Sequence, residues 1–130
     1  MVLEPEQVAA AWPLIREGLE TLCEQRPDDF SIDGILERLY AGHWHLWVVW
    51  DGEVRGLVAT AFFTNAAYRK CCSIPFATGG GAKQFVHLKD TIEAWAARNG
   101  CSKMDIICRT GWARYLEDYR KEHLVMGKRL

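Results

Sequence analysis

Between residues 71 and 108 the sequence alternates strand-like and helix-like segments in an order that few folds accommodate. Residues 71–77 are rich in strand formers, and apolar residues then recur at helical spacing from 85 to 96. Asn99-Gly100 is a typical helix end, after which 104–108 is again strand-like. A strand, a helix and a strand at this length predict a right-handed parallel crossover.

The segment that joins the first strand to the helix is Thr78-Gly79-Gly80-Gly81-Ala82-Lys83. Glycines leave successive backbone N–H groups unshielded, and the first turn of the next helix adds partial positive charge, so the junction suits an anion such as phosphate. Lys83 supports this interpretation, and a flexible connector or a tight turn is the alternative. The chain contains neither a P-loop motif nor a Gly-x-Gly-x-x-Gly dinucleotide motif.

Two amphipathic helices are predicted in the N-terminal part of the chain. The first begins at Pro5 and carries a buried stripe as far as Leu22. Pro13 lies inside this stripe and predicts a kink or a division into two pieces. Ser31 can cap the second helix, which Gly42 ends.

The remaining elements complete one α+β domain over residues 1–130. The predicted strands cover residues 1–3, 44–50, 54–63, 69–77, 104–108 and 123–130, and a last helix covers 111–119. The strands over 44–50 and 54–63 are predicted to pair through the tight turn at Asp51-Gly52, and the strand over 69–77 extends this hairpin into an antiparallel meander. The predicted fold is a mixed, mostly antiparallel sheet of about six strands with one parallel crossover, flanked by about four helices.

Charge is distributed unevenly along the chain. Residues 1–65 hold four Arg, no Lys and eleven Asp or Glu, whereas residues 66–130 hold twelve Lys or Arg and six Asp or Glu. The basic half contains the glycine loop, which agrees with a phosphorylated ligand and also with attraction between two halves of one domain. Because no dense basic run with interleaved aromatic residues occurs, nucleic acid is not an expected partner.

Cysteine usage and hydropathy predict a reduced protein that does not enter a membrane. The five cysteines include no Cys-x-x-Cys pair, so neither a disulfide framework nor a metal site is expected. No apolar run approaches the roughly 20 residues that cross a bilayer, and the N-terminal residues do not resemble a secretory signal. We therefore expect a cytoplasmic protein.

The order of the predicted elements resembles the GNAT superfamily of acyl-CoA-dependent N-acetyltransferases over nearly the whole chain. The resemblance implies that acetyl-CoA is held by the end of the meander's last strand and by the loop that follows it. The implied cofactor-binding residues are Ile74, Phe76, Ala77, Gly79, Gly80, Gly81, Ala82 and Lys83. Segments 92–96 and 109–116 also look like short acetyltransferase-like proteins of bacteriophages, which implies a location in the host cytoplasm or in a virion.

Catalytic residues follow from the same resemblance. Many family members use a tyrosine on the last helix to protonate the departing thiolate, and Glu117 aligns with that position. Tyr115 and Tyr119, two residues to either side, are therefore the implied acids. The second and third predicted meander strands contain no Asp or Glu, which leaves His87 and Asp105 as titratable groups for a base.

Two functions fit these observations. In the first, the chain transfers an acetyl group from acetyl-CoA to an amine of a small molecule or a protein. In the second, it is a catalytically degenerate GNAT-fold protein, a phage-encoded inhibitor, scaffold or virion component that binds a host or virion protein. The glycine loop favours the first function. The second is favoured because the Arg or Gln of the family's loop is replaced here by Phe76 or Ala77. Lys83 could substitute as a point charge, but a lysine lacks the forked geometry of an arginine. An unrelated α+β domain with a structural glycine turn is a third reading.

Overall fold

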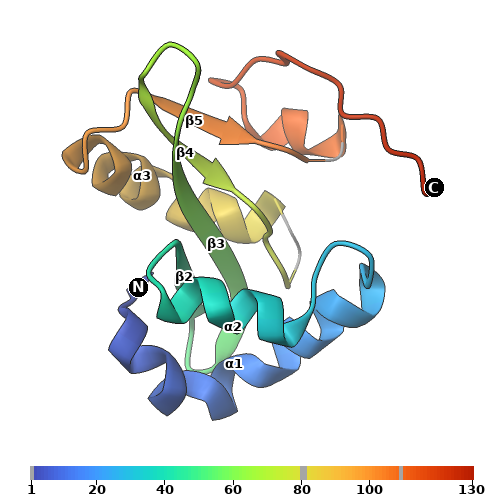
Figure 1. The fold of residues 1–130 in the computed structure, drawn as a ribbon. Coiled ribbons are helices and arrows are strands. Elements are labelled where there is room, and N and C mark those ends of the chain that lie inside the picture. Colours follow the sequence, from blue (N-terminus) through green and yellow to red (C-terminus); the bar gives the residue numbers. More distant parts are fainter. Residues whose placement is uncertain (1, 80–81, 109) are drawn as a thin grey trace.

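In the computed structural model, which describes residues 2–79, 82–108 and 110–130, the chain forms a mixed α+β fold (Figure 1). The elements in chain order are β1 (Val2–Leu3), α1 (Pro5–Gln25), α2 (Ile32–Tyr40), β2 (Trp44–Trp50), β3 (Val54–Thr64), β4 (Lys70–Ile74), α3 (Ala82–Arg98), β5 (Lys103–Ile106) and a 3-10 helix, η1 (Thr110–Tyr115). The strands lie in the order β1-β2-β3-β4-β5. Strands β4 and β5 are parallel and the other neighbouring pairs are antiparallel, which confirms the predicted meander and crossover.

The two N-terminal helices begin where local side-chain chemistry predicts. The Ser31 side chain accepts a hydrogen bond from the backbone N–H of Gly34 at 3.0 Å and caps α2. Glu4 and Gln7 form a reciprocal capping box at the start of α1. Pro13 does not divide α1, because the buried residues before and after it pack into one core.

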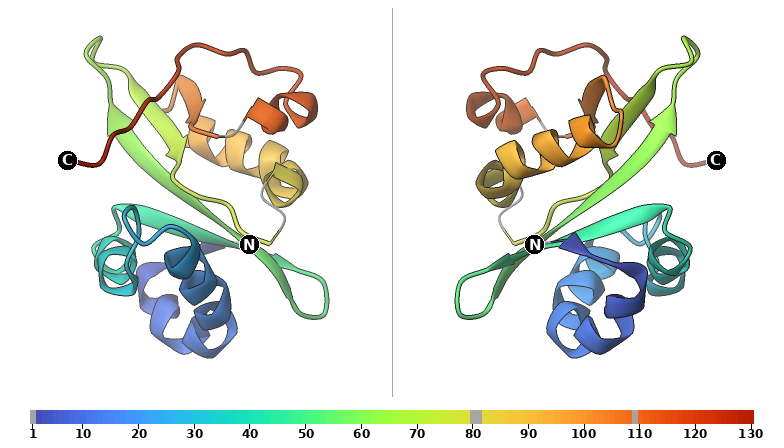
Figure 2. Two further views of the ribbon diagram at one scale, coloured as in Figure 1. Left: turned by 90° about the vertical axis from the view of Figure 1, so that its right-hand side faces the viewer. Right: turned by 90° about the vertical axis from the view of Figure 1, so that its left-hand side faces the viewer.

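Helices cover both faces of the sheet (Figure 2). The core under α1 and α2 includes Leu46 of β2 and Leu57 of β3, whereas the core under α3 includes their sequence neighbours Trp47 and Val58. Adjacent strand residues thus point into opposite cores, as the period of two requires. The sheet is therefore buried on both sides by apolar side chains from nearly every element.

The C-terminal region differs from the prediction. Over the described residues the sheet has five strands and the chain three α-helices, so the estimates of about six strands and about four helices were slightly too high. Residues 123–130 form no strand and are exposed, and the predicted helix over 111–119 is instead a 3-10 helix that ends at Tyr115.

Side-chain contacts explain the path of this region. Lys89 binds the Asp118 carboxylate at 2.7 Å, and the Tyr119 hydroxyl donates a hydrogen bond to Glu93 at 2.6 Å, so residues 118–119 are fixed on α3. These contacts draw the chain off the helical path. The segment after them pairs with no strand of the sheet, although Glu122 contacts Lys103 of the edge strand β5 at 2.5 Å.

Candidate functional site

A β-bulge interrupts β4 at the point where it leaves β5. Ser73 of β4 pairs with Ala61 of β3, so a regular ladder would place Val58 opposite Phe76. Val58 pairs instead with Ala77, which means that one extra residue has been accommodated on the β4 side. The parallel pairing of β4 with β5 ends at Ile74 and Ile106, directly before this bulge.

The bulge reverses the direction of the side chains that follow it. Ile74 lies in the core under α3, and Phe76 lies in the core under α1 and α2. Two residues separated by two positions would share a face in a regular strand, so the extra residue is what moves Phe76 to the other side.

The backbone of Ala77 faces away from β3. The Ala59 N–H donates to the Phe76 carbonyl at 3.0 Å, and the Thr78 N–H donates to the Leu57 carbonyl at 2.8 Å. In this antiparallel pattern the N–H and C=O of the residue between these two bonds point to the opposite edge. Both groups of Ala77 lack a hydrogen-bond partner among the described residues and are directed to the side from which β5 has diverged.

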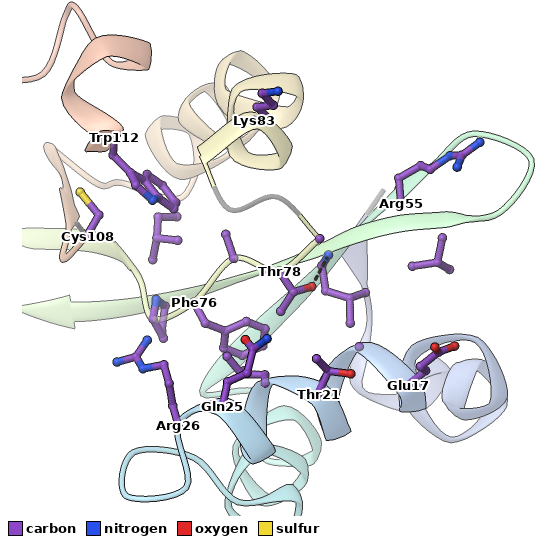
Figure 3. Close-up of a pocket in the computed structure, with 18 of the residues that line it drawn as sticks. Glu17, Thr21, Gln25, Arg26, Arg55, Phe76, Thr78, Lys83, Cys108 and Trp112 are labelled. Carbon is purple, nitrogen blue, oxygen red and sulfur yellow. Dashed lines mark hydrogen bonds between the residues drawn. The ribbon is translucent and has the colours of Figure 1, made fainter. Parts of the chain in front are cut away.

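A cleft of about 1520 Å³ occupies this opening (Figure 3). Its walls come from one side of α1, from the β2–β3 hairpin, from residues 74–79, from the start of α3 and from the segment 107–115. Of the predicted cofactor-binding residues, Ile74, Phe76, Ala77, Gly79 and Lys83 line the cleft. Gly80 and Gly81 lie outside the described residues, and Ala82 is the first residue of α3.

The first residue of the glycine loop is packed tightly against β3. Gly79 has a φ of +72°, and a Cβ atom there would lie 2.2 Å from the carbonyl oxygen of Arg55. Thr78 fixes the same segment, since its hydroxyl oxygen accepts a hydrogen bond from the Leu57 N–H at 3.1 Å (Figure 3). The Gln84 side chain donates a hydrogen bond to the Gly79 carbonyl at 2.6 Å and joins the loop to α3. Gly79 is thus required for a close approach of two backbones.

The charged groups of the cleft are predominantly basic. Among the described lining residues these are Glu17, Glu53, Arg26, Arg55, Lys83 and Arg114. Arg55 binds Glu53 at 2.7 Å, and Arg26 binds Asp29, outside the lining, at 3.0 Å. Lys83 and Arg114 have no carboxylate partner in the described part of the chain, so the end of the cleft near α3 and η1 carries uncompensated positive charge that suits an anion.

The structure places the two candidate tyrosines in different environments. Tyr115 lines the cleft, and its ring lies 5.0 Å from the guanidinium carbon of Arg114. Tyr119 is not among the described residues that line the cleft. Burial and the hydrogen bond to Glu93 raise the pKa of the Tyr119 hydroxyl, which keeps this group protonated and engaged on α3.

The candidate bases lie elsewhere. His87 is exposed on α3, and Asp105 binds Lys103 at 3.2 Å; neither belongs to the described lining of the cleft. Cys108 does line it, but partial burial raises the pKa of its thiol, which does not favour the reactive thiolate.

Glu17 and Arg26 also line the cleft, and they were not predicted from the sequence because their helix was assigned only a role in the core. The polar residues Glu17, Thr21 and Gln25 recur every four positions along α1, and this spacing could have indicated a polar face of the helix opposite its buried stripe.

No described helix is long and apolar enough to cross a membrane. The described residues also contain no group of three or more His, Cys, Asp or Glu side chains arranged to hold a metal ion.

Solved structures of GNAT-type acetyltransferases share this fold. An aminoglycoside acetyltransferase from an uncultured soil metagenomic sample, in complex with sisomicin, has a TM-score of 0.68 and 13% identity over 100% of this chain and 94% of its own. An acetyltransferase of Trypanosoma brucei has a TM-score of 0.66 and 17% identity, covering 100% of this chain and 97% of its own. A ribosomal-protein-alanine N-acetyltransferase from Brucella melitensis biovar Abortus 2308 has a TM-score of 0.65 and 13% identity, covering 100% and 98%.

No protein-family model matches the sequence, and no curated protein matches it either. At identities this low the structural likeness defines the fold, and the chain has the GNAT fold that the order of its elements predicted. The similarity to bacteriophage proteins stays a prediction.

Proposed function

We propose that this chain binds acetyl-CoA in the cleft and transfers the acetyl group to an amine. The observation that carries the proposal is the pair of unpartnered Ala77 backbone groups, which the bulge turns into the cleft where β4 and β5 separate. An extended ligand with amide groups can pair with such a strand edge as a further strand would. The pantetheine arm of CoA is a ligand of that kind.

The end of the cleft at the glycine loop and the start of α3 would bind the phosphates of acetyl-CoA. Gly79, Gly80, Gly81 and Ala82 would offer backbone N–H groups, α3 the positive end of its dipole, and Lys83 a point charge. Ile74 and Phe76 would contact the apolar part of the arm beside Ala77. Lys83 takes the place of the family's Arg or Gln, and Arg114 adds a second cation to the same end of the cleft.

The transfer itself requires little further machinery. A neutral amine attacks the thioester carbonyl, a C–N bond forms, the C–S bond breaks, and the proton lost by the nitrogen is balanced by one gained by the thiolate sulfur. Tyr115 is the candidate tyrosine that lines the cleft, and we assign it as the proton donor to that sulfur. Tyr119, whose hydroxyl is bonded to Glu93, would keep a structural role.

Calorimetric titration with acetyl-CoA tests the binding half of this proposal. We expect Lys83→Ala to weaken acetyl-CoA binding about fivefold, because one cation next to a diphosphate is worth about 1 kcal/mol when it is partly exposed. The loss should shrink as salt is added. The matched control is Lys121→Ala, which removes an exposed lysine outside the described lining of the cleft. An absence of heat with the unmodified protein at millimolar acetyl-CoA would remove the proposed function.

Release of free thiol from acetyl-CoA in the presence of an amine tests the chemical half. We expect Tyr115→Phe to lower kcat by about 10- to 100-fold with little change in acetyl-CoA affinity, since general-acid catalysis contributes on this scale. Tyr119→Phe should change kcat less than about twofold while lowering stability by about 1 kcal/mol, because it removes only the bond to Glu93. Equal kcat values for both variants would show that the thiolate leaves without Tyr115.

Binding without thiol release across a panel of amines would instead favour the degenerate GNAT-fold protein. The neighbouring structures do not decide the acceptor, because one acts on aminoglycosides and another on a ribosomal-protein alanine according to their names.

A further inference from the structure

A second pocket lies next to the cleft, on the side of the sheet covered by α2. It has a volume of about 220 Å³, and its described lining includes Phe30, Ser31, Arg38, Trp44 and Pro75. Pro75 also lines the large cleft, so the two spaces border the same residue, next to the bulge where β4 leaves β5. At this size the small pocket would accommodate only one end of a ligand.

Arg38 is the distinctive group of this pocket. Its guanidinium carbon lies 5.3 Å from the centroid of the Trp44 ring, and its Nη1 donates a hydrogen bond to the Gly34 carbonyl at 2.9 Å. These two contacts orient the planar fork. No carboxylate contacts Arg38 within the described residues, so its charge and its other N–H groups are available to a ligand.

The remaining charges of the pocket do not offset Arg38. Asp29 also lines it, but Arg26 binds one Asp29 carboxylate oxygen through Nε at 3.2 Å and through Nη2 at 3.0 Å. The Ser31 hydroxyl oxygen accepts from the Gly34 N–H, which leaves its own proton free to be donated. The pocket therefore presents the hydrogen-bond donors of Arg38 and Ser31, while the one carboxylate of its described lining, Asp29, is already paired with Arg26.

The walls of the pocket are aromatic. Phe30 and Trp44 meet edge to face at 6.5 Å between ring centroids, and both contact the ring of Phe76. Phe76 is the residue that the bulge turns toward this side of the sheet. Arg26 covers one face of Phe30 at 4.8 Å and Arg38 one face of Trp44. A flat apolar group would therefore contact the remaining ring surfaces, whereas a hydrated polycation would meet Arg38 and little to replace its water.

We propose that this pocket binds the carboxylate of the acceptor, which is a small amine carrying both a carboxylate and an apolar or aromatic group. The assignment rests on the proposed function, since it takes the cleft beside Pro75 as the place where the amine is acetylated. The carboxylate pairs with Arg38 and Ser31, the apolar group lies against Phe30 and Trp44, and the amine extends past Pro75 into the cleft.

Phenylalanine and phenylalanine amide are suitable probes, because they differ only in the carboxylate. We expect calorimetry on the full chain, with no acetyl-CoA present, to show about tenfold tighter binding of phenylalanine than of its amide. Arg38→Gln should reduce this preference to about one, since the amide competes equally once the guanidinium is removed. Arg98→Gln, a change at an exposed arginine in the last turn of α3, should leave the preference intact.

The outcomes separate the two proposals. Equal affinity for the two probes, tighter binding of an aminoglycoside, or no binding of either probe at millimolar concentration would overturn the assignment of the pocket, whatever acetyl-CoA does. An Arg38-dependent preference together with no binding of acetyl-CoA would support the pocket and remove the proposed function. The comparison of the two probes on the unmodified protein does not depend on the variant folding.

Discussion

Replacing Gly79 with alanine is expected to destabilise the protein by about 3 kcal/mol or more, lowering Tm by about 10 °C. Two effects add. An alanine at a φ of +72° costs about 1–2 kcal/mol in backbone strain. Its Cβ would also lie 2.2 Å from the Arg55 carbonyl oxygen and force the loop away from β3.

Gly52→Ala is the matched control for this change. Gly52 has almost the same conformation, with a φ of +71°, but a Cβ atom there would meet nothing within 4 Å. The control should therefore show the strain alone, about 1–2 kcal/mol. Equal losses of stability in the two variants, measured by thermal and urea denaturation, would contradict the tight contact between the loop and β3.

The same variant affects the proposed cofactor site. Displacing Gly79 would weaken the two hydrogen bonds between Thr78 and Leu57 and the hydrogen bond from the Gln84 side chain to the Gly79 carbonyl. These three bonds hold the loop on β3 and α3. We expect Gly79→Ala to weaken acetyl-CoA binding more than tenfold at a temperature where it is still folded. Gly100→Ala, at another glycine of positive φ that is outside the described lining of the cleft, should leave binding within about twofold.

Phe85→Ala should be the most damaging core substitution under α3, with a loss of about 3–5 kcal/mol in the free energy of unfolding. The Phe85 side chain is fully buried, at 0% exposure, and it joins α3 to the C-terminal region. Its ring stacks on Trp112 at 6.1 Å and meets Tyr119 edge to face at 6.5 Å. The cavity left by alanine would loosen the segment that carries Tyr115.

Val86→Ala provides the comparison on the neighbouring residue. The Val86 side chain is 41% exposed, so its truncation should change the free energy of unfolding by less than about 0.5 kcal/mol. Urea denaturation measures both variants under the same conditions. A loss below about 1 kcal/mol for Phe85→Ala would mean that α3 does not depend on this contact.

The local chemistry of several elements was sufficient to predict them. Ser31 marks the start of α2 because its side chain bonds a backbone group only three residues away. Gly100 ends α3 in the left-handed conformation, with a φ of +85°, as its place after Asn99 indicates. The parallel crossover follows equally from the order of its segments, and the structure places the strand before the loop beside β5.

The C-terminal errors have a common cause. Residues 111–119 carry apolar side chains at helical spacing, yet Asp118 and Tyr119 bond to Lys89 and Glu93 of α3 and end the helical path early. The pattern of 123–130 resembles a strand, but a strand forms only where its backbone pairs with another strand, and these residues pair with none. Neither constraint is contained in the segment itself.

As far as β5, local sequence therefore determined the kinds of element, their order and the position of the glycine loop, because capping, turn formation and apolar periodicity act within a few residues. Tertiary structure alone decided the bulge between Ser73 and Ala77, the exposure of the Ala77 backbone, the positions of Tyr115 and Tyr119 relative to the cleft, and the contact of Arg38 with Trp44. Each of these depends on which residue lies opposite in a different element, and that partner is fixed only when the whole sheet and its helices pack together.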